Sequence, residues 1–365
     1  MTKQELGGYL VFSLLFFTAH GHAHHAVTAH FDRNKNIDIR GVVVDFKLRS
    51  PHSSFVIDGI AFINGVRQSD AVERWEVEAS SLPGMRKMGI HQDTFQLDDD
   101  IQVIAWQNRQ PDFRFVFGTT FIAADDKVFD EAIEPRSQDP VSRSRIDGSV
   151  GVQKIVGRWR SRGYLNGDES PLPLNEVGLT AWRSYDPKLS SATTCESQSI
   201  PGVFSAPYTF DVQINGQRVT LHNEAYSVVR TVQIGGQASL ANPNGVYGKA
   251  NAQVDAGTLV VESRDYPPSK WGLGIATHLN GGGADVPSSD QKTVVERYSV
   301  SEDGQTLILD YILTDPVYMT KPHNGRVEFA RVADDTPIYP YDCDVESAAM
   351  FSRNRGDELL QIGKE

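Results

Sequence analysis

Basic residues are scarce in this sequence relative to acidic ones. Its 365 residues include 35 Lys and Arg against 47 Asp and Glu, which gives a formal net charge of −12. Nucleic-acid binding needs a positively charged surface, so we expect no nucleic-acid partner. The same deficit disfavours docking on anionic lipid surfaces. With 39% hydrophobic and 22% charged residues, the composition is nevertheless that of a globular protein rather than a disordered one.

Long hydrophobic runs are also lacking. The run Leu10–Phe17 is much shorter than the roughly 20 residues that a membrane-spanning helix needs, and no later segment approaches that length. It follows Lys3 and precedes small residues up to Ala23, a pattern typical of a secretory signal peptide over residues 1–23. An uncleaved anchor is the alternative. We expect a periplasmic or secreted protein with no transmembrane segment once the signal is removed.

Three widespread catalytic motifs are absent: the Gly-x-Ser-x-Gly elbow, His-Glu-x-x-His and the phosphate-binding loop. The remaining candidates for catalytic residues are His222, Glu224 and Arg230. They lie on neighbouring predicted strands, and the two-residue spacing of His222 and Glu224 would make these two face the same way unless a turn intervenes. A histidine beside a carboxylate can act as a general base, but surface polar positions are the alternative for all three.

The chain has only two cysteines, Cys195 and Cys343. In an exported protein an even number of cysteines favours a disulfide, whose loop would span most of the second half of the chain. Two free buried thiols are the alternative, because the sequence does not give the distance between them.

Residues 24–130 have the pattern of a small β domain. Short segments with alternating hydrophobic residues are separated by turn signals such as Asn64-Gly65 and Pro83-Gly84. Five or six short strands predict a small barrel of the oligonucleotide/oligosaccharide-binding (OB) type. The predicted strands are 37–48, 55–58, 60–63, 74–78, 101–106 and 113–117.

Residues 151–345 predict a second, larger β domain, between a linker at 131–150 and a polar tail at 346–365. About eight successive strands are typical of an up-and-down antiparallel barrel, with one short helix at 174–185. Eight strands leave room for one small ligand. Alternating residues such as Phe210 and Val212 would point into this interior, and a completely filled core is the alternative.

The residues His24-His25, Asp32 and Pro51-His52 carry a resemblance over roughly residues 24–125. In their order and spacing they resemble an uncharacterised family of exported bacterial proteins of unknown function, in which Ser50 would be Asn. The resemblance implies an exported small β domain and no established activity.

Gly157-Arg158-Trp159 resembles the Gly-x-Trp signature of the lipocalin and calycin group. There the Trp packs under an Arg from the last strand, a part that Arg326 or Arg331 would play here. Residues 151–345 also resemble uncharacterised exported bacterial proteins, which implies no known reaction. The expected fold class is therefore all-β, a small OB-like barrel followed by a larger lipocalin/calycin-like barrel.

The histidines near the expected cleavage site are candidate copper ligands. Cleavage after Ala23 would make His24 the amino terminus, and its α-amine and imidazole could chelate Cu(II) together with His30 or His52. Cleavage after Gly21 would place His24 third from a free terminus, which also suits Cu(II). Zinc, held by His24, His25 and His52, is the second choice. Binding should fail below about pH 6.5, where imidazole is protonated, and a solvated His-rich end is the alternative.

From the sequence we therefore expect an exported binding protein for a metal ion, a small apolar ligand, or both. The alternatives are an exported enzyme, with a copper centre or a His/Glu acid–base pair, and an envelope scaffold without either site.

Overall fold

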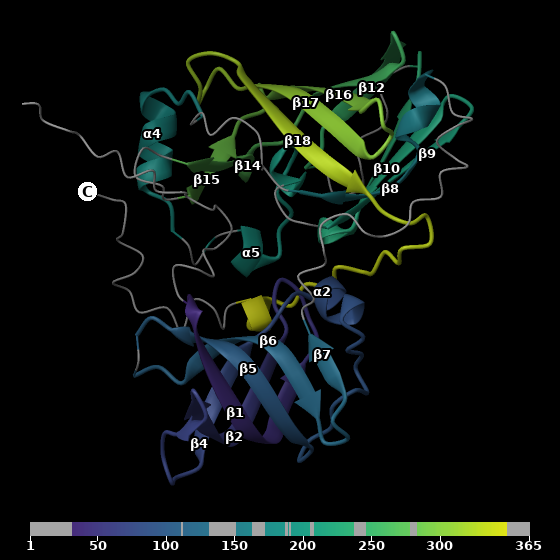
Figure 1. Cartoon of the computed structure of the whole chain (residues 1–365). Helices are drawn as coiled ribbons and strands as arrows, with labels where there is room; N and C mark the ends of the chain where they lie inside the picture. The colour runs from purple at the N-terminus through teal and green to yellow at the C-terminus, as the bar shows by residue number, and fades with distance from the viewer. Residues whose placement is uncertain are drawn as a thin grey trace, which may run out of the picture.

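The computed structural model describes residues 31–110, 112–130, 151–162, 172–186, 189, 191–204, 208–236, 246–277 and 283–348. β-strands dominate these residues, which confirms the all-β prediction. They form two main sheets, one from Phe31 to Asp130 and one from Gly157 to Arg331 (Figure 1). The predicted signal peptide and linker lie outside the described residues, so the domain boundaries stay a prediction. No helix among the described residues is long and apolar enough to cross a membrane.

The first sheet closes into a small barrel. Strand β1 pairs with both β2 and β5, which completes a ring in the order β1-β2-β4-β6-β5, with β4 and β6 parallel. This ring is the predicted OB-like barrel. Its elements are β1 (Phe31–Lys47), β2 (Ser54–Ile63), β3 (Val66–Arg67), β4 (Glu73–Glu78), α2 (Leu82–Lys87), β5 (Asp100–Asn108), β6 (Phe115–Ala123) and β7 (Val128–Asp130).

One long strand replaces the two that the sequence predicted at 55–58 and 60–63. Gly59 lies inside β2, where it pairs with Gly41 of β1. A side chain on Gly41 would collide with the backbone at Asp58, so the two glycines permit a close approach of the strands. The prediction of two separate strands was wrong, because Gly59 continues the strand and allows the close approach of β1.

The second sheet is a nearly closed antiparallel barrel of nine strands. Consecutive strands are neighbours, β18 returns to β8, and a bridge between Ile234 and Ala252 brings β11 to β12. The strands are β8 (Gly157–Ser161), β9 (Thr209–Asn215), β10 (Arg218–Asn223), β11 (Val228–Gln233), β12 (Lys249–Asp255), β13 (Thr258–Arg264), β16 (Thr293–Val300), β17 (Thr306–Thr314) and β18 (His323–Arg331). The hairpin of β14 (Ser269–Thr277) and β15 (Gly283–Ser288), which the sequence did not predict, is inserted between β13 and β16.

Short helices surround this barrel. The predicted helix at 174–185 is α4 (Glu176–Arg183), whose amino end is capped by the Asn175 side chain. The others are α5 (Ser191–Thr194) and the 3-10 turns η1 (Gly151–Ile155), η3 (Gly202–Phe204) and η4 (Ala225–Ser227).

One end of the large barrel is closed by the contact that the Gly-x-Trp resemblance implied. The guanidinium carbon of Arg331 lies 3.9 Å from the centre of the Trp159 ring. Arg331 also donates hydrogen bonds to the carbonyls of Lys154, Val156 and Gly304, while the Trp159 indole donates to the Ile155 carbonyl. Of the two arginines expected from the sequence, Arg331 makes this contact, and Arg326 instead pairs with Asp310 on the outer surface. We call this end the floor.

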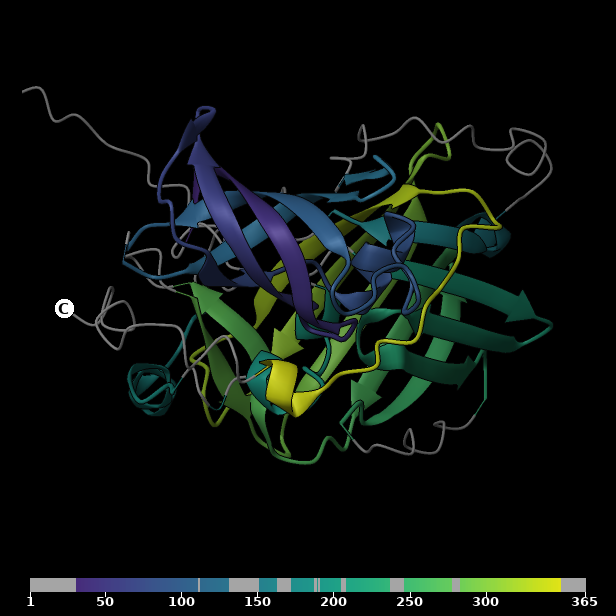
Figure 2. The same cartoon turned by 90° about the horizontal axis from the view of Figure 1, so that it is seen from below.

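The two barrels are joined by the segment 332–348, which we call the strap. It runs from β18 across the junction between the barrels (Figures 1 and 2). The predicted disulfide is present, and it ties Cys343 of the strap to Cys195 beside α5, with the Cα atoms 5.7 Å apart. On the other side, Ser50 of the small barrel exchanges backbone hydrogen bonds with Asp342 and Asp344 of the strap.

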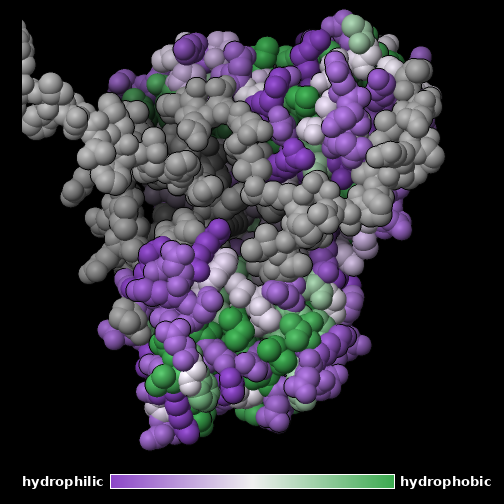
Figure 3. All heavy atoms as spheres, in the orientation of Figure 1, coloured by the Kyte–Doolittle hydropathy of each residue, from purple (hydrophilic) through white to green (hydrophobic). Residues whose placement is uncertain are grey.

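Exposed hydrophobic side chains are dispersed. In the view of Figure 3 small hydrophobic groups on the small barrel are separated by hydrophilic residues. Single exposed residues such as Val66, Val72 and Leu97 are normal on a protein surface and do not mark a binding face.

We predict that R331M weakens the large barrel. The substitution removes three hydrogen bonds from a charged donor and the cation–π contact with Trp159, so the free energy of unfolding should fall by about 2–4 kcal/mol. R326M, which breaks only an exposed ion pair on the same strand, should lower the free energy of unfolding by less than about 1 kcal/mol. Urea unfolding followed by circular dichroism measures both, and equal losses would contradict the role given to the floor.

Candidate functional site

An ion pair lies inside the large barrel. Along β11 the residues Val228, Arg230 and Val232 are buried and alternate with exposed ones, so Arg230 faces inward. Its two terminal nitrogens donate to the carboxylate of Glu296 on β16, at 2.9 and 2.6 Å. Arg230 is 5% exposed and Glu296 is 0% exposed, so water contributes almost nothing to their solvation.

Two hydroxyl groups complete this cluster. Tyr298 donates to Glu296 Oε1 at 2.5 Å, and Ser263 Oγ accepts from Arg230 at 3.2 Å. Burial by itself would lower the pKa of Arg230, but Glu296 outweighs that effect and the pKa is raised, so Arg230 stays charged. Burial raises the pKa of the Tyr298 hydroxyl, which therefore remains a neutral donor. Four polar groups thus converge inside the large barrel.

A lysine lies in the same inward column of β16. Lys292, Val294, Glu296 and Tyr298 are buried and alternate along the chain. Nζ of Lys292 donates to Ser199 Oγ at 3.0 Å and to the Gly272 carbonyl, and it lies 4.5 Å from the centre of the Tyr266 ring. Among the described residues no carboxylate lies within 4.0 Å of this amine. Burial lowers the pKa of Lys292 to about 7, although Asp315 and Glu296 oppose the shift.

The structure does not bring together the three residues proposed for catalysis. His222 pairs with Val229 across β10 and β11 and lies half-buried on the outer side, whereas Arg230 points inward. The turn η4 begins directly after Glu224 and ends the alternation on which their common face depended, with Tyr226 at a positive φ of 53°. Burial lowers the pKa of His222, so the imidazole is mostly neutral near pH 7.

Glu224 is used at the junction between the barrels. Its fully buried carboxylate accepts from Lys87 Nζ at 2.8 Å, and from the backbone N–H groups of Thr209 and Tyr339 at 3.0 Å. Burial lowers the pKa of Lys87, against the effect of Glu224. One carboxylate therefore connects α2 of the small barrel, β9 of the large barrel and the strap.

Of the predicted metal ligands, only His52 can be placed. His24, His25 and His30 lie outside the described residues. His52 is mostly buried between β1 and β2, with Nδ1 3.4 Å from Oε1 of the buried Glu78. In the part of the chain that the structure describes, no three His, Cys, Asp or Glu side chains converge on a possible metal position.

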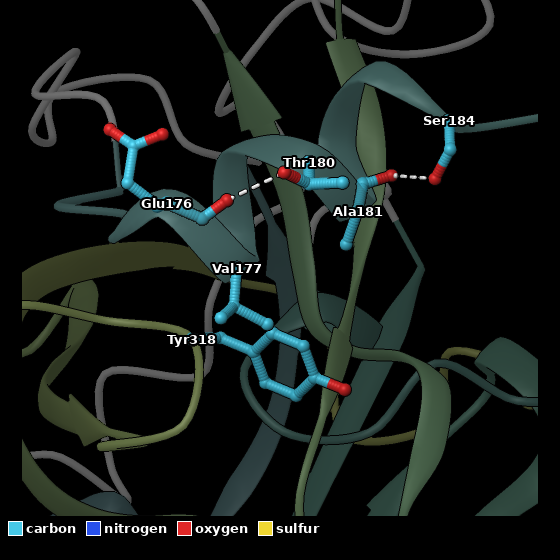
Figure 4. Close-up of a pocket in the computed structure, with 6 residues that line it drawn as sticks. All are labelled: Glu176, Val177, Thr180, Ala181, Ser184 and Tyr318. Atoms are coloured by element: carbon cyan, nitrogen blue, oxygen red, sulfur yellow. Dashed lines mark hydrogen bonds between the residues drawn. The ribbon is translucent and has the colours of Figure 1, made fainter.

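A surface hollow of about 490 Å³ lies against α4 (Figure 4). It is lined by Glu176, Val177, Thr180, Ala181, Ser184 and Tyr318. The two helix hydroxyls, of Thr180 and Ser184, donate to carbonyls of the helix itself. None of the polar lining residues is buried, in contrast to the Arg230–Glu296 cluster, which makes the barrel interior the better candidate site.

The sequence also contains a signal for this interior, which hydrophobic alternation alone does not reveal. Lys292, Glu296 and Tyr298 have the same two-residue phase as Val294, which marks an inward-facing column with polar members. What the sequence could not give is the partner, because Arg230 lies 66 residues before Glu296.

Residues 13–114 match a family of unknown function, DUF6152. This agrees with the resemblance expected for residues 24–125, and the DUF6152 segment ends before β6 and covers less than half of the chain. No curated protein matches the chain.

Solved structures of fatty-acid- and lipid-binding proteins align with about half of the chain, at low similarity. The REP1-NXSQ fatty acid transporter is 10% identical with a TM-score of 0.27, over 49% of this chain and 96% of that one. Caenorhabditis elegans lipid binding protein 8 is 9% identical with a TM-score of 0.28, over 50% and 99%. The fatty-acid-binding protein of Manduca sexta is 11% identical with a TM-score of 0.25, over 48% and 98%.

We predict a pH-dependent stability difference between the wild type and K292M. The unfolded lysine has a pKa of 10.5 and the folded one about 7, so the unfolded state binds more protons between these values. The wild type should therefore gain stability relative to K292M as the pH rises from 7 to 9, by at most about 1.4 kcal/mol per pH unit. Urea midpoints at both pH values test this, with R297M on the outer face of β16 as the control. A difference that does not change with pH would contradict the prediction.

Proposed function

We propose that this chain is a binding protein whose large barrel takes up a small, mainly apolar ligand. The observation that carries the proposal is the cluster of Arg230, Glu296, Tyr298 and Ser263 inside an apolar, nearly closed barrel. Ligand sites typically combine apolar walls with a few convergent polar groups that fix orientation.

The cluster favours binding over a purely structural role. A buried ion pair is often no more stabilising than apolar residues of the same volume, because both charges lose their hydration. A barrel that only had to be stable could fill this space with aliphatic side chains. The enzyme alternative has less support, since His222 and Glu224 do not line a common wall and Glu224 is engaged at the junction.

We predict saturable binding of the uncharged fluorescent probe N-phenyl-1-naphthylamine, at one molecule per chain. A252L, which adds a larger side chain to an inward position of β12, should weaken binding by about tenfold, equivalent to ~1.4 kcal/mol. Q253L, which adds the same side chain to the next, exposed position, should leave binding unchanged. Fluorescence titration measures the affinities, and circular dichroism checks that both variants are folded. Absence of binding, or equal effects of both substitutions, would refute an interior site.

We further propose that the protein is exported and that its amino-terminal histidines bind Cu(II) together with His52, with zinc as the second choice. The observation that favours this is the placement of His52 beside Glu78, with Nδ1 toward the carboxylate. Metal-binding histidines commonly use one ring nitrogen for the metal and turn the other toward a carboxylate that orients the ring.

We predict stoichiometric copper in mature protein purified from the exported fraction. Intact mass gives the cleavage position, and metal analysis gives the copper content. H52A should lose most of the copper, and E78Q should bind about tenfold more weakly. H91A, which removes an exposed histidine of the same barrel, should retain it. Metal-free wild-type protein with His24 or His22 as its first residue would count against the site.

A further inference from the structure

Lys292 lies at the end of the large barrel opposite the floor. It directly precedes β16, and β16 runs antiparallel to β17 and parallel to β18, so Arg331 lies at the other end of the strands. The amine is 0% exposed and is held under the β14–β15 hairpin by the Gly272 carbonyl. The floor is closed by Trp159 and Arg331, so a ligand would reach the interior from the Lys292 end.

The amine lacks a direct counter-charge among the described residues. Its partners, Ser199 Oγ and the Gly272 carbonyl, are neutral. Glu296 is engaged by Arg230 and Tyr298. The carboxylate of Asp315 accepts from Ser289, through both N–H and hydroxyl, and from the N–H of Val317. Among the described residues, the two acids that act on Lys292, Glu296 and Asp315, are therefore both engaged by other donors.

A second donor beside this site is also unused. The Ser288 hydroxyl is buried, in a residue that is 2% exposed, and has no hydrogen-bond partner among the described residues. It packs directly against Gly272, where a side chain would collide with it. A buried hydroxyl without a partner is costly, which points to an acceptor beyond the described residues, such as a ligand.

We propose that the ligand of the large barrel is an amphiphile with one anionic group, bound by Lys292 and Ser288 beneath the β14–β15 hairpin. The inference rests on the proposed binding function and adds the charge of the ligand to it. A carboxylate, sulfonate or phosphate accepts hydrogen bonds from both donors and supplies the negative charge that Lys292 lacks. The apolar part of the ligand then extends toward the Arg230–Glu296 cluster.

Two fluorescent probes that differ by one charge test this proposal on the full-length protein. 8-Anilinonaphthalene-1-sulfonate carries a sulfonate, and N-phenyl-1-naphthylamine has the same ring system without it. K292M should weaken the binding of the sulfonate probe about tenfold, because one charge-assisted hydrogen bond is lost. The affinity for the neutral probe should change less than about twofold. R297M removes a cation from the outer face of the same strand, where it pairs with Asp255, and should change neither affinity.

The outcomes separate the two levels of the proposal. Suppose the wild type binds the neutral probe, but K292M leaves the affinity for the sulfonate probe unchanged or lowers both affinities equally. The anionic site is then refuted, and apolar binding stands. If the wild type binds neither probe, the binding function itself is refuted. S288A provides a second, structurally mild variant, which should lower only the affinity for the sulfonate probe, by about threefold. An unchanged sulfonate affinity in both S288A and K292M would overturn the inference.

Discussion

The Arg230–Glu296 ion pair imposes the strictest condition on the large barrel, because two charges inside an apolar interior must be neutralised and hydrogen-bonded at the same time. Removing one partner of such a pair typically destabilises a protein by about 3–5 kcal/mol, since the other charge remains buried. The hydroxyls of Tyr298 and Ser263 add the remaining hydrogen bonds. Since β11 and β16 are not neighbours in the sheet, the pair connects distant parts of the barrel wall through its interior.

A buried acidic side chain also needs hydrogen-bond donors at the junction of the two barrels, where Glu224 lies. The Glu224 carboxylate accepts hydrogen bonds from three donors in three separate segments, and it also interacts electrostatically with Arg160. The donors Lys87 and Tyr339 lie 137 and 115 residues away in sequence. The disulfide fixes the strap to the large barrel, and Ser50 fixes it to the small one. The position of Glu224 is therefore determined by the docking of the barrels, which explains why it is unavailable to His222.

The local pattern of hydrophobic residues was enough to predict the strands and the two barrels. Alternation predicted strands, and their number predicted two barrels. The contact at the floor was implied only by the resemblance of Gly157-x-Trp159 to the lipocalin and calycin signature, which left Arg326 and Arg331 open. Prediction failed where pairing across the chain decides the outcome. A break was predicted between residues 58 and 60 because Gly41, the partner of Gly59, is only apparent once β1 and β2 pair. Glu224 looked like a neighbour of His222 because the turn at Tyr226, with its positive φ, has no strong sequence signal.

The two basic side chains inside the large barrel, Arg230 and Lys292, differ in how readily they lose a proton, which matters for the binding and release of a charged ligand. An arginine stays protonated under all ordinary conditions, so inside the barrel it needs a permanent partner, and Arg230 has one in Glu296. A lysine can lose its proton when its surroundings disfavour the charge, and burial lowers the pKa of Lys292 to about 7. An amine can therefore be neutral in the empty barrel and take up a proton when an anion arrives. For the anion site proposed above, lysine is therefore better suited to this position than arginine.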